Sequence, residues 1–163
     1  KERSVVLSGF SKAFAMTGWR LGFVCGPQSI VSRALKIHQY NMLCAPITSQ
    51  FAGIEAIKHP DQYIDPMKAA YKKRRQVIVD GLNDIGLPTV MPGGAFYCFS
   101  SIESTGLSSE DFCLALLKQQ RVAVVPGNAF GESGKGYIRC CYATDMSVIK
   151  EALKRIKLFV KSL

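Results

Sequence analysis

The sequence predicts an α/β fold, in which short strands alternate with amphipathic helices. Apolar residues make up 48% of the 163 residues and charged residues 20%, a composition that supports a buried core and excludes a disordered chain. Short apolar runs bounded by Gly and Pro alternate with longer segments whose apolar residues recur at helical spacing. No apolar run exceeds about five residues, far short of the roughly 20 that a membrane helix needs, so we expect no membrane partner.

The first part of the chain holds four segments with the periodicity of a strand or a helix. They are residues 4–8, predicted as a buried strand, residues 20–26, predicted as a second strand, and residues 29–42 and 46–58, predicted as helices. A loop rich in small residues, 9–18, separates the two strands. The second of these helices begins with a proline in its first turn and ends at His59-Pro60, because the residue before a proline disfavours helix.

After His59-Pro60 the predicted order is helix, strand, strand, helix, strand, strand, helix, which is typical of a compact α/β sandwich. We therefore predict one domain over residues 1–60 and a second over residues 61–163. The elements are a helix ending at Ile85, strands at 89–91 and 95–101, a helix with Ser108 as N-cap and Asp111 in the capping-box place, strands at 122–125 and 137–143, and a last helix capped by Thr144 or Asp145.

The chain is basic, with 21 Lys and Arg against 12 Asp and Glu, a net charge of +9. Such a charge admits an anionic ligand, a nucleic acid or an acidic partner. Five of the basic residues fall together in the long predicted helix: Lys68, Lys72, Lys73, Arg74 and Arg75. Because a charge run on a helix is usually a solvated face, and no helix-turn-helix or aromatic-interleaved pattern accompanies it, we expect no nucleic-acid partner.

Six cysteines occur without any C-x-x-C spacing, at positions 25, 44, 98, 113, 140 and 141. Most lie in apolar runs, which favours buried free thiols in a reducing cytoplasm over a disulfide framework. A zinc site is disfavoured as well, since only His38 and His59 could join the thiolates, so we expect no bound metal.

The chemistry-bearing residues lie in the loop between the first two strands. Lys12 follows a predicted strand, and the ends of strands are where α/β sheets hold ligands. A lysine that is partly desolvated near another cation becomes a nucleophile toward a carbonyl group. Arg20, eight residues on, would be that cation, and its planar fork suits a phosphate or a carboxylate. The residues alone leave open the alternative that Lys12 and Arg20 are a solvated surface pair.

Residues 11–22, SKAFAMTGWRLG, are similar to the cofactor-lysine signature S-K-x-x-x-M-T-G-W-R-x-G of the class I/II aminotransferases, the fold-type I pyridoxal-phosphate enzymes. Residues 92–97 match the family's P-x-G-[AT]-F-Y element, residues 122–127 its V-x-V-x-P-G strand, and residues 137–139 the strand that carries its substrate-binding arginine. The resemblance covers essentially the whole chain but only the C-terminal portion of the family's length. It implies the C-terminal part of the large domain of a PLP-dependent transferase, followed by the α/β-sandwich small domain.

The resemblance also implies a role for each site residue. Lys12 would form a Schiff base with pyridoxal 5′-phosphate and then move a proton between the Cα of the substrate and C4′ of the cofactor. Arg20 would bind the phosphate, and Arg139 would pair with the α-carboxylate of the substrate. Ser11 would add a hydroxyl to the phosphate or close a local turn. Many relatives carry a serine at the position of Gly9.

Arg139 has a structural alternative as well, which is an ion pair with Glu103 or Glu132. Trp19 and Tyr97 are predicted to pack rather than to act in catalysis, and the segment from Asn128 to Gly131 is predicted to shape the rim of the pocket.

The implied activity is transfer of an amino group between an L-amino acid of the aspartate, aromatic or alanine type and a 2-oxo acid, in amino-acid metabolism and biosynthesis. The resemblance further implies a cytoplasmic homodimer. The family's aspartate at the pyridine nitrogen and its ring-stacking aromatic lie before the lysine, outside this chain. We therefore expect the isolated chain to have little or no transaminase activity.

Three other functions stay open at this point. A carbon–sulfur β-lyase of the same fold shares the lysine signature but eliminates at Cβ. An inactive aminotransferase-like domain would serve as a binding module. A structural fragment would be unable to hold the cofactor.

Overall fold

The computed structural model describes residues 2–163, and residue 1, where the first predicted domain begins, lies outside the described residues. The chain divides into two compact units, one ending at Met67 and the other spanning Lys68–Leu163. Each unit has its own cluster of buried apolar side chains. The division falls inside a long helix, whereas the sequence predicts a boundary at His59-Pro60.

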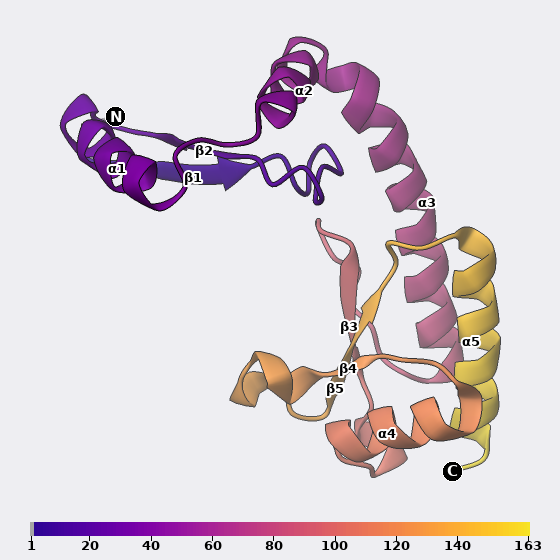
Figure 1. The fold of residues 1–163 in the computed structure, drawn as a ribbon. Helices are drawn as coiled ribbons and strands as arrows, with labels where there is room; N and C mark the ends of the chain where they lie inside the picture. The colour runs from indigo at the N-terminus through magenta and orange to yellow at the C-terminus, as the bar shows by residue number, and fades with distance from the viewer. Residues whose placement is uncertain (1) are drawn as a thin grey trace. The chain divides into compact units, whose positions relative to one another are not determined.

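The first unit contains four elements before the long helix (Figure 1): β1 (Val6–Gly9), β2 (Gly22–Cys25), α1 (Gln28–Asn41) and α2 (Ile47–Lys58). β1 and β2 are antiparallel, and Gly9 lies opposite Gly22. Every residue of both strands is exposed. The prediction of a buried strand at residues 4–8 is therefore wrong for the described chain, because β1 pairs only with β2 and no second layer covers the pair.

The long helix α3 (Pro60–Ile85) belongs to both units and contributes Ile78, Val79 and Leu82 to the core of the second. Gly86, the residue that follows the helix, has a φ of +92°. This left-handed residue lets the Leu87 amide donate to the Leu82 carbonyl at 3.0 Å, so the last carbonyls of the helix are satisfied as in a Schellman turn.

The second unit is a two-layer α/β sandwich, as the sequence predicts. Its sheet has the order β3 (Tyr97–Ser101), β5 (Tyr137–Cys141), β4 (Val125–Pro126), and both neighbouring pairs are antiparallel. The helices of this unit besides α3 are α4 (Ser109–Gln120) and α5 (Met146–Lys161) (Figure 1). Apolar side chains of the three helices and of the sheet form one buried cluster. Along β5, Ile138 and Cys140 are buried in this cluster while Arg139 lies on the other face of the sheet.

Close contacts hold the helices of the second unit together. Phe112 of α4 meets Phe159 of α5 edge to face, with ring centroids 5.1 Å apart. Gly81 lets α3 approach α5, because a Cβ at this position would be 2.5 Å from Leu153 Cδ1. These contacts join α5 to both of the other helices.

Three short 3-10 helices connect the elements of this unit: η1 (Glu103–Thr105), η2 (Gly127–Phe130) and η3 (Glu132–Gly134). Gly127 and Gly134 bring the two ends of the η2–η3 segment together, and a Cβ on either one would overlap the backbone of the other. The segment that carries Phe130 is thereby closed into a compact loop beside β5.

Two predicted strands form only in part. Residues 122–124 lie outside β4 and instead line a cavity beside α5, and the pairing with β5 begins only at Val125, opposite Arg139. At residues 89–91 only Thr89 makes a bridge, to Ser100. The Asn83 amide occupies both the N–H and the carbonyl of Thr89, at 2.9 and 3.0 Å, so these backbone groups are used by a side chain rather than by a strand.

The cap of α4 is confirmed: the Ser108 hydroxyl accepts a hydrogen bond from the Asp111 amide at 3.1 Å. We expect Ser108→Ala to lower the free energy of unfolding by about 1 kcal/mol, because one N–H group of the first turn loses its partner. Equilibrium unfolding in urea measures the change. Ser147→Ala, on the exposed side of α5, is the matched control and should leave the unfolding midpoint within error. Equal midpoints for both variants would contradict the cap.

Candidate active site

Lys12 lies in a loop that begins and ends at the same end of the β1–β2 pair. The Phe10 amide donates to the Leu21 carbonyl at 3.2 Å, which extends the pairing by one position beyond Gly9 and Gly22. The Phe14 and Met16 amides both donate to the Phe10 carbonyl, at 3.3 and 3.4 Å. The loop therefore folds back on its own first residue, and Lys12 is exposed between these anchors.

Helix α2 supports the back of this loop. Phe10 and Met16 are 5% and 7% exposed, and they pack against Ala56 of α2. Gly53 permits close contact, since a Cβ there would be 2.5 Å from Leu21 Cδ2. The Ser49 hydroxyl donates to the carbonyl of Trp19 at 2.7 Å. Phe10 and Met16 thus anchor the loop, and Lys12 and Arg20 are left at the surface.

Arg20 and Ala15 have left-handed backbone conformations, with φ of +51° and +53°. Such conformations cost about 1–2 kcal/mol for residues with a Cβ and tend to gather at functional sites. Arg20 Nη1 donates to the Thr17 carbonyl at 3.0 Å, so one edge of the guanidinium is held by the loop itself. The side chain is exposed, and its remaining donors can reach an anion.

The remaining candidates of this loop have weaker support. Ser11 is half-buried, and within the described residues its hydroxyl makes no hydrogen bond, so its predicted contact with a phosphate stays a prediction. Trp19, predicted to pack, is 46% exposed, and its hydrogen bonds are made by its backbone: its amide donates to the Met16 carbonyl at 3.3 Å, and its carbonyl accepts from Ser49. Gly9 faces the opposite strand so closely that a Cβ would be 3.2 Å from the Leu21 carbonyl oxygen.

Arg139 lies in the second unit, on the face of the sheet away from the helices. Its Cζ is 4.2 Å from the centroid of the Tyr97 ring and 4.5 Å from that of Phe130. Its Nε is buried and has no hydrogen-bond partner within residues 2–163. A buried guanidinium N–H without a partner costs free energy, so this site favours an anionic ligand.

The structure does not contain the alternative predicted for Arg139, an ion pair with Glu103 or Glu132. Glu132 pairs with Lys135 at 2.6 Å, and the carboxylate of Glu103 lies beside Gly136. In the part of the chain that the structure describes, no ion pair joins Arg139 to either glutamate. The arginine is therefore held by aromatic rings and not by an acid.

Sequence reasoning missed this aromatic contact to Arg139. Tyr97 lies diagonally across the β3–β5 ladder from Arg139, whose direct partner is Phe99, and diagonal neighbours are within reach of long side chains. Antiparallel pairing of residues 95–101 with 137–143 would have revealed the diagonal. Phe130, by contrast, comes from η2, and no sequence period indicates its position. Asn128, in the same segment, donates from its amide to the Glu110 carboxylate.

The basic segment of α3 is only partly a solvated face. Arg74 pairs with Asp145 at 3.7 Å and lies over the Tyr71 ring, 5.5 Å from its centroid. Arg75 donates to the Pro92 carbonyl at 2.8 Å, and its Nε is buried. Because two of the five cations hold the second unit together, the segment gives little support to a nucleic-acid partner.

All six cysteines are free, and only three of them are buried as predicted. Cys25, Cys44 and Cys141 are exposed, since they lie on an uncovered strand, in a loop and on the open face of the sheet respectively. Cys98 and Cys140 lie opposite each other across β3 and β5. A hydrogen bond between the two thiols lowers the pKa of Cys98 and raises the pKa of Cys140.

Burial and the nearby Glu110 carboxylate raise the pKa of Cys113 to about 11, from 9.0. Because the thiolate is the reactive form, we expect Cys113 to react with iodoacetamide at pH 8 about 100-fold more slowly than a thiol of ordinary pKa, and burial slows it further. Its reaction should accelerate as the pH rises toward 11. Alkylation followed by peptide mapping measures this, with exposed Cys141 as the internal control. Equal labelling of Cys113 and Cys141 at pH 8 would contradict the assignment.

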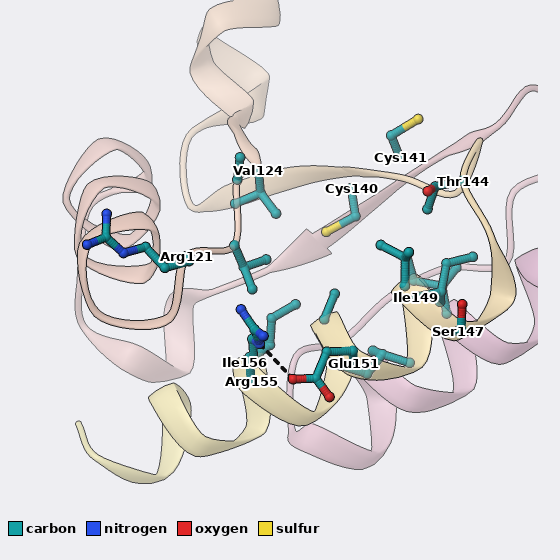
Figure 2. Close-up of a pocket in the computed structure, with 16 residues that line it drawn as sticks. Arg121, Val124, Cys140, Cys141, Thr144, Ser147, Ile149, Glu151, Arg155 and Ile156 are labelled. Carbon is teal, nitrogen blue, oxygen red and sulfur yellow. Dashed lines mark hydrogen bonds and ion pairs between the residues drawn. The ribbon is translucent and has the colours of Figure 1, made fainter.

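A cavity of about 490 Å³ lies elsewhere in the second unit, between α5, β5 and residues 121–124 (Figure 2). Figure 2 shows the Cys140 sulfur pointing toward it and the Cys141 sulfur pointing away. Arg155 and Glu151 form an ion pair at 2.8 Å at its edge. Neither Lys12, Arg20 nor Arg139 lines this cavity. Over residues 2–163 we find no group of three metal-ligating side chains and no helix long and apolar enough to cross a membrane.

The sequence pattern of the family named aminotransferase class I and II matches residues 1–156. The chain belongs to this family. The Bacillus subtilis protein YugH, named as an aminotransferase, is 56% identical over 98% of the chain, and an aspartate aminotransferase of Pyrococcus abyssi is 44% identical over 96% of it. The chain spans only 42% and 41% of the length of these two relatives.

Solved structures agree with this assignment. An aromatic aminotransferase from Pyrococcus horikoshii superposes with a TM-score of 0.93 at 45% identity, covering 99% of this chain and 44% of that protein. The aspartate aminotransferase of Rhizobium meliloti gives a TM-score of 0.91 at 36% identity, over 99% of this chain and 42% of its own. The fold is therefore that of the C-terminal part of these enzymes, which confirms the predicted fold class.

Proposed function

We propose that the whole protein is a pyridoxal 5′-phosphate-dependent aminotransferase that moves an amino group between an L-amino acid and a 2-oxo acid. The observation that carries the proposal is the anchored loop between β1 and β2, which presents the Lys12 amine and the Arg20 guanidinium from one end of a strand pair. Relatives named as aspartate and aromatic-amino-acid aminotransferases support it.

The residues of this loop fit a phosphorylated aldehyde cofactor. Lys12 is a primary amine, the group that links covalently to an aldehyde, and Arg20 supplies charged donors to a phosphate. Both side chains are exposed on a loop whose backbone is fixed by buried Phe10 and Met16. When bound, the cofactor would act as the electron sink for the bonds at the substrate's Cα. Ser11 is a candidate for a second contact with the phosphate.

The chain's own contribution to the reaction would be binding, orientation and proton transfer. The Lys12 amine, once released by the entering amino acid, would take the proton from the substrate's Cα as general base and deliver it to C4′ of the cofactor as general acid. Arg139 would hold the α-carboxylate through two parallel N–H···O bonds and so fix the direction of the Cα–H bond. Its unpartnered Nε is one of the donors that such a carboxylate would satisfy.

We further propose that the whole protein is a cytoplasmic homodimer that acts in amino-acid metabolism and biosynthesis. The three exposed free thiols suit a reducing compartment. The apolar side chains exposed on β1 and β2 suit burial against further protein; among them are Val6, Leu7, Phe23 and Val24.

An assay of the whole protein with added cofactor tests the proposed reaction. Aspartate, an aromatic amino acid and alanine are each supplied with 2-oxoglutarate, and the products are separated. A new amino acid whose formation depends on the oxo acid supports amino transfer. Release of pyruvate and thiol from a cysteine conjugate, without any need for an oxo acid, would identify the carbon–sulfur lyase instead. The isolated chain, run in parallel, should show little or no turnover.

A further inference from the structure

The Arg139 guanidinium lies against two aromatic rings that come from different elements. Tyr97 belongs to β3, and its ring centroid is 4.2 Å from Arg139 Cζ. Phe130 belongs to η2, which follows β4 in the chain, and its centroid is 4.5 Å away. One ring therefore comes from a strand paired with β5, and the other comes from the segment after β4.

Both rings are fixed in place by further packing. Phe130 meets Phe99 edge to face at 5.6 Å, and Phe99 is the residue directly opposite Arg139 in the ladder. Tyr97 packs against Phe96 with centroids 4.5 Å apart. The loop that carries Phe130 is closed by the contact of Gly127 with Gly134. The rings are therefore a rigid support rather than mobile cover.

Aromatic rings can hold a cation without using its hydrogen-bond donors. A ring face attracts a guanidinium through its quadrupole, so the planar N–H groups stay available to a ligand. An acidic side chain in the same place would occupy those donors. Arg139 has no such acid within the described residues, and its buried Nε is unpartnered. A preoriented guanidinium also loses less side-chain freedom when it binds an anion.

We propose that Tyr97 and Phe130 are positioning residues, which hold the Arg139 guanidinium in one plane so that its edge meets the carboxylate of the substrate. This inference rests on the proposed function and deepens it. A planar carboxylate accepts two parallel N–H···O bonds from the edge of the fixed guanidinium.

The test compares steady-state kinetics of the whole protein in five variants, one of which is Arg139→Gln. Phe130→Leu and Tyr97→Leu remove a ring, Tyr97→Phe keeps it, and Tyr63→Leu, the control, changes an exposed tyrosine of α3. For each, KM and kcat are measured with alanine. We expect each ring deletion to raise the KM for alanine about 10-fold with kcat within about twofold.

The outcomes separate this inference from the proposed function. Restoration of affinity in Tyr97→Phe, with the Tyr63→Leu control near the parent, supports positioning by the rings. An unchanged KM in both ring deletions, while Arg139→Gln does raise it, overturns the positioning role and leaves the carboxylate site intact. An unchanged KM in Arg139→Gln would overturn both. Phe130 is half exposed, so Phe130→Leu carries the test if Tyr97→Leu proves unstable.

Discussion

Replacement of Lys12 by alanine should lower the kcat for amino transfer by the whole protein by about 10⁴-fold or more. A methyl group can neither link to an aldehyde nor carry a proton, and general acid–base catalysis alone contributes about 10²- to 10⁴-fold. Lys12 is exposed, and the loop is anchored by Phe10 and Met16, so the substitution should leave the fold intact. Turnover with 2-oxoglutarate and far-ultraviolet circular dichroism together measure the effect.

The control for this substitution is Lys118→Ala, which removes an exposed lysine in the last turn of α4. It should retain the parent turnover. A Lys12→Ala protein that is folded and still turns over within tenfold of the parent would contradict the role of this amine, whatever the family resemblance implies.

Arg139→Gln should lower kcat/KM for amino-acid substrates by about 100-fold. Two charge-assisted hydrogen bonds to the carboxylate are lost, each worth about 1.5–3 kcal/mol, and a single amide N–H recovers part of that loss. Arg139→Lys should recover only a small fraction, because an ammonium keeps the charge but lacks the planar fork. Initial rates over a range of amino-acid concentration measure both variants.

Arg121→Gln supplies the matched control, because this arginine is exposed at the C-terminal end of α4, away from the rings that hold Arg139. Its kcat/KM should stay near the parent value. If Arg139→Lys were as active as the parent, a simple positive charge would suffice, and the bidentate role of Arg139 would be wrong.

The order of elements could be predicted wherever local chemistry decided it. The apolar spacing of α3 and α5, the cap at Ser108 and the left-handed Gly86 are local signals, and the structure has the helices there. Ala95 shows the limit of such signals. Its φ of +62° delays the start of β3 to Tyr97, and a sequence pattern of apolar residues does not reveal a left-handed alanine.

Tertiary contacts overrode the local pattern elsewhere. Thr89 has the sequence environment of a strand, yet the Asn83 amide binds both of its backbone groups. Residues 122–124 are apolar enough for a strand but line a cavity beside α5. The first outcome depends on a side chain six residues away and the second on the surroundings of helix α5, and the period of apolar residues reports neither.

The candidate site also has one part that the sequence could predict and one part that it could not. Lys12 and Arg20 could be identified because their motif is long and contiguous, and the loop that holds them is closed by neighbours in sequence. The surroundings of Arg139 could not, because its supporting rings come from β3 and η2, 42 and 9 residues away in sequence. The family resemblance indicated the guanidinium, but not the rings that hold it.

The central claim is that one amine, Lys12, carries the cofactor, and reductive trapping tests it most directly. The whole protein is incubated with pyridoxal 5′-phosphate, reduced with borohydride, digested and mapped by mass spectrometry. The account predicts a single stoichiometric phosphopyridoxyl label on the peptide that contains Lys12, and its loss in Lys12→Ala. Label scattered over surface lysines, or a stoichiometric label that persists in Lys12→Ala, would contradict it.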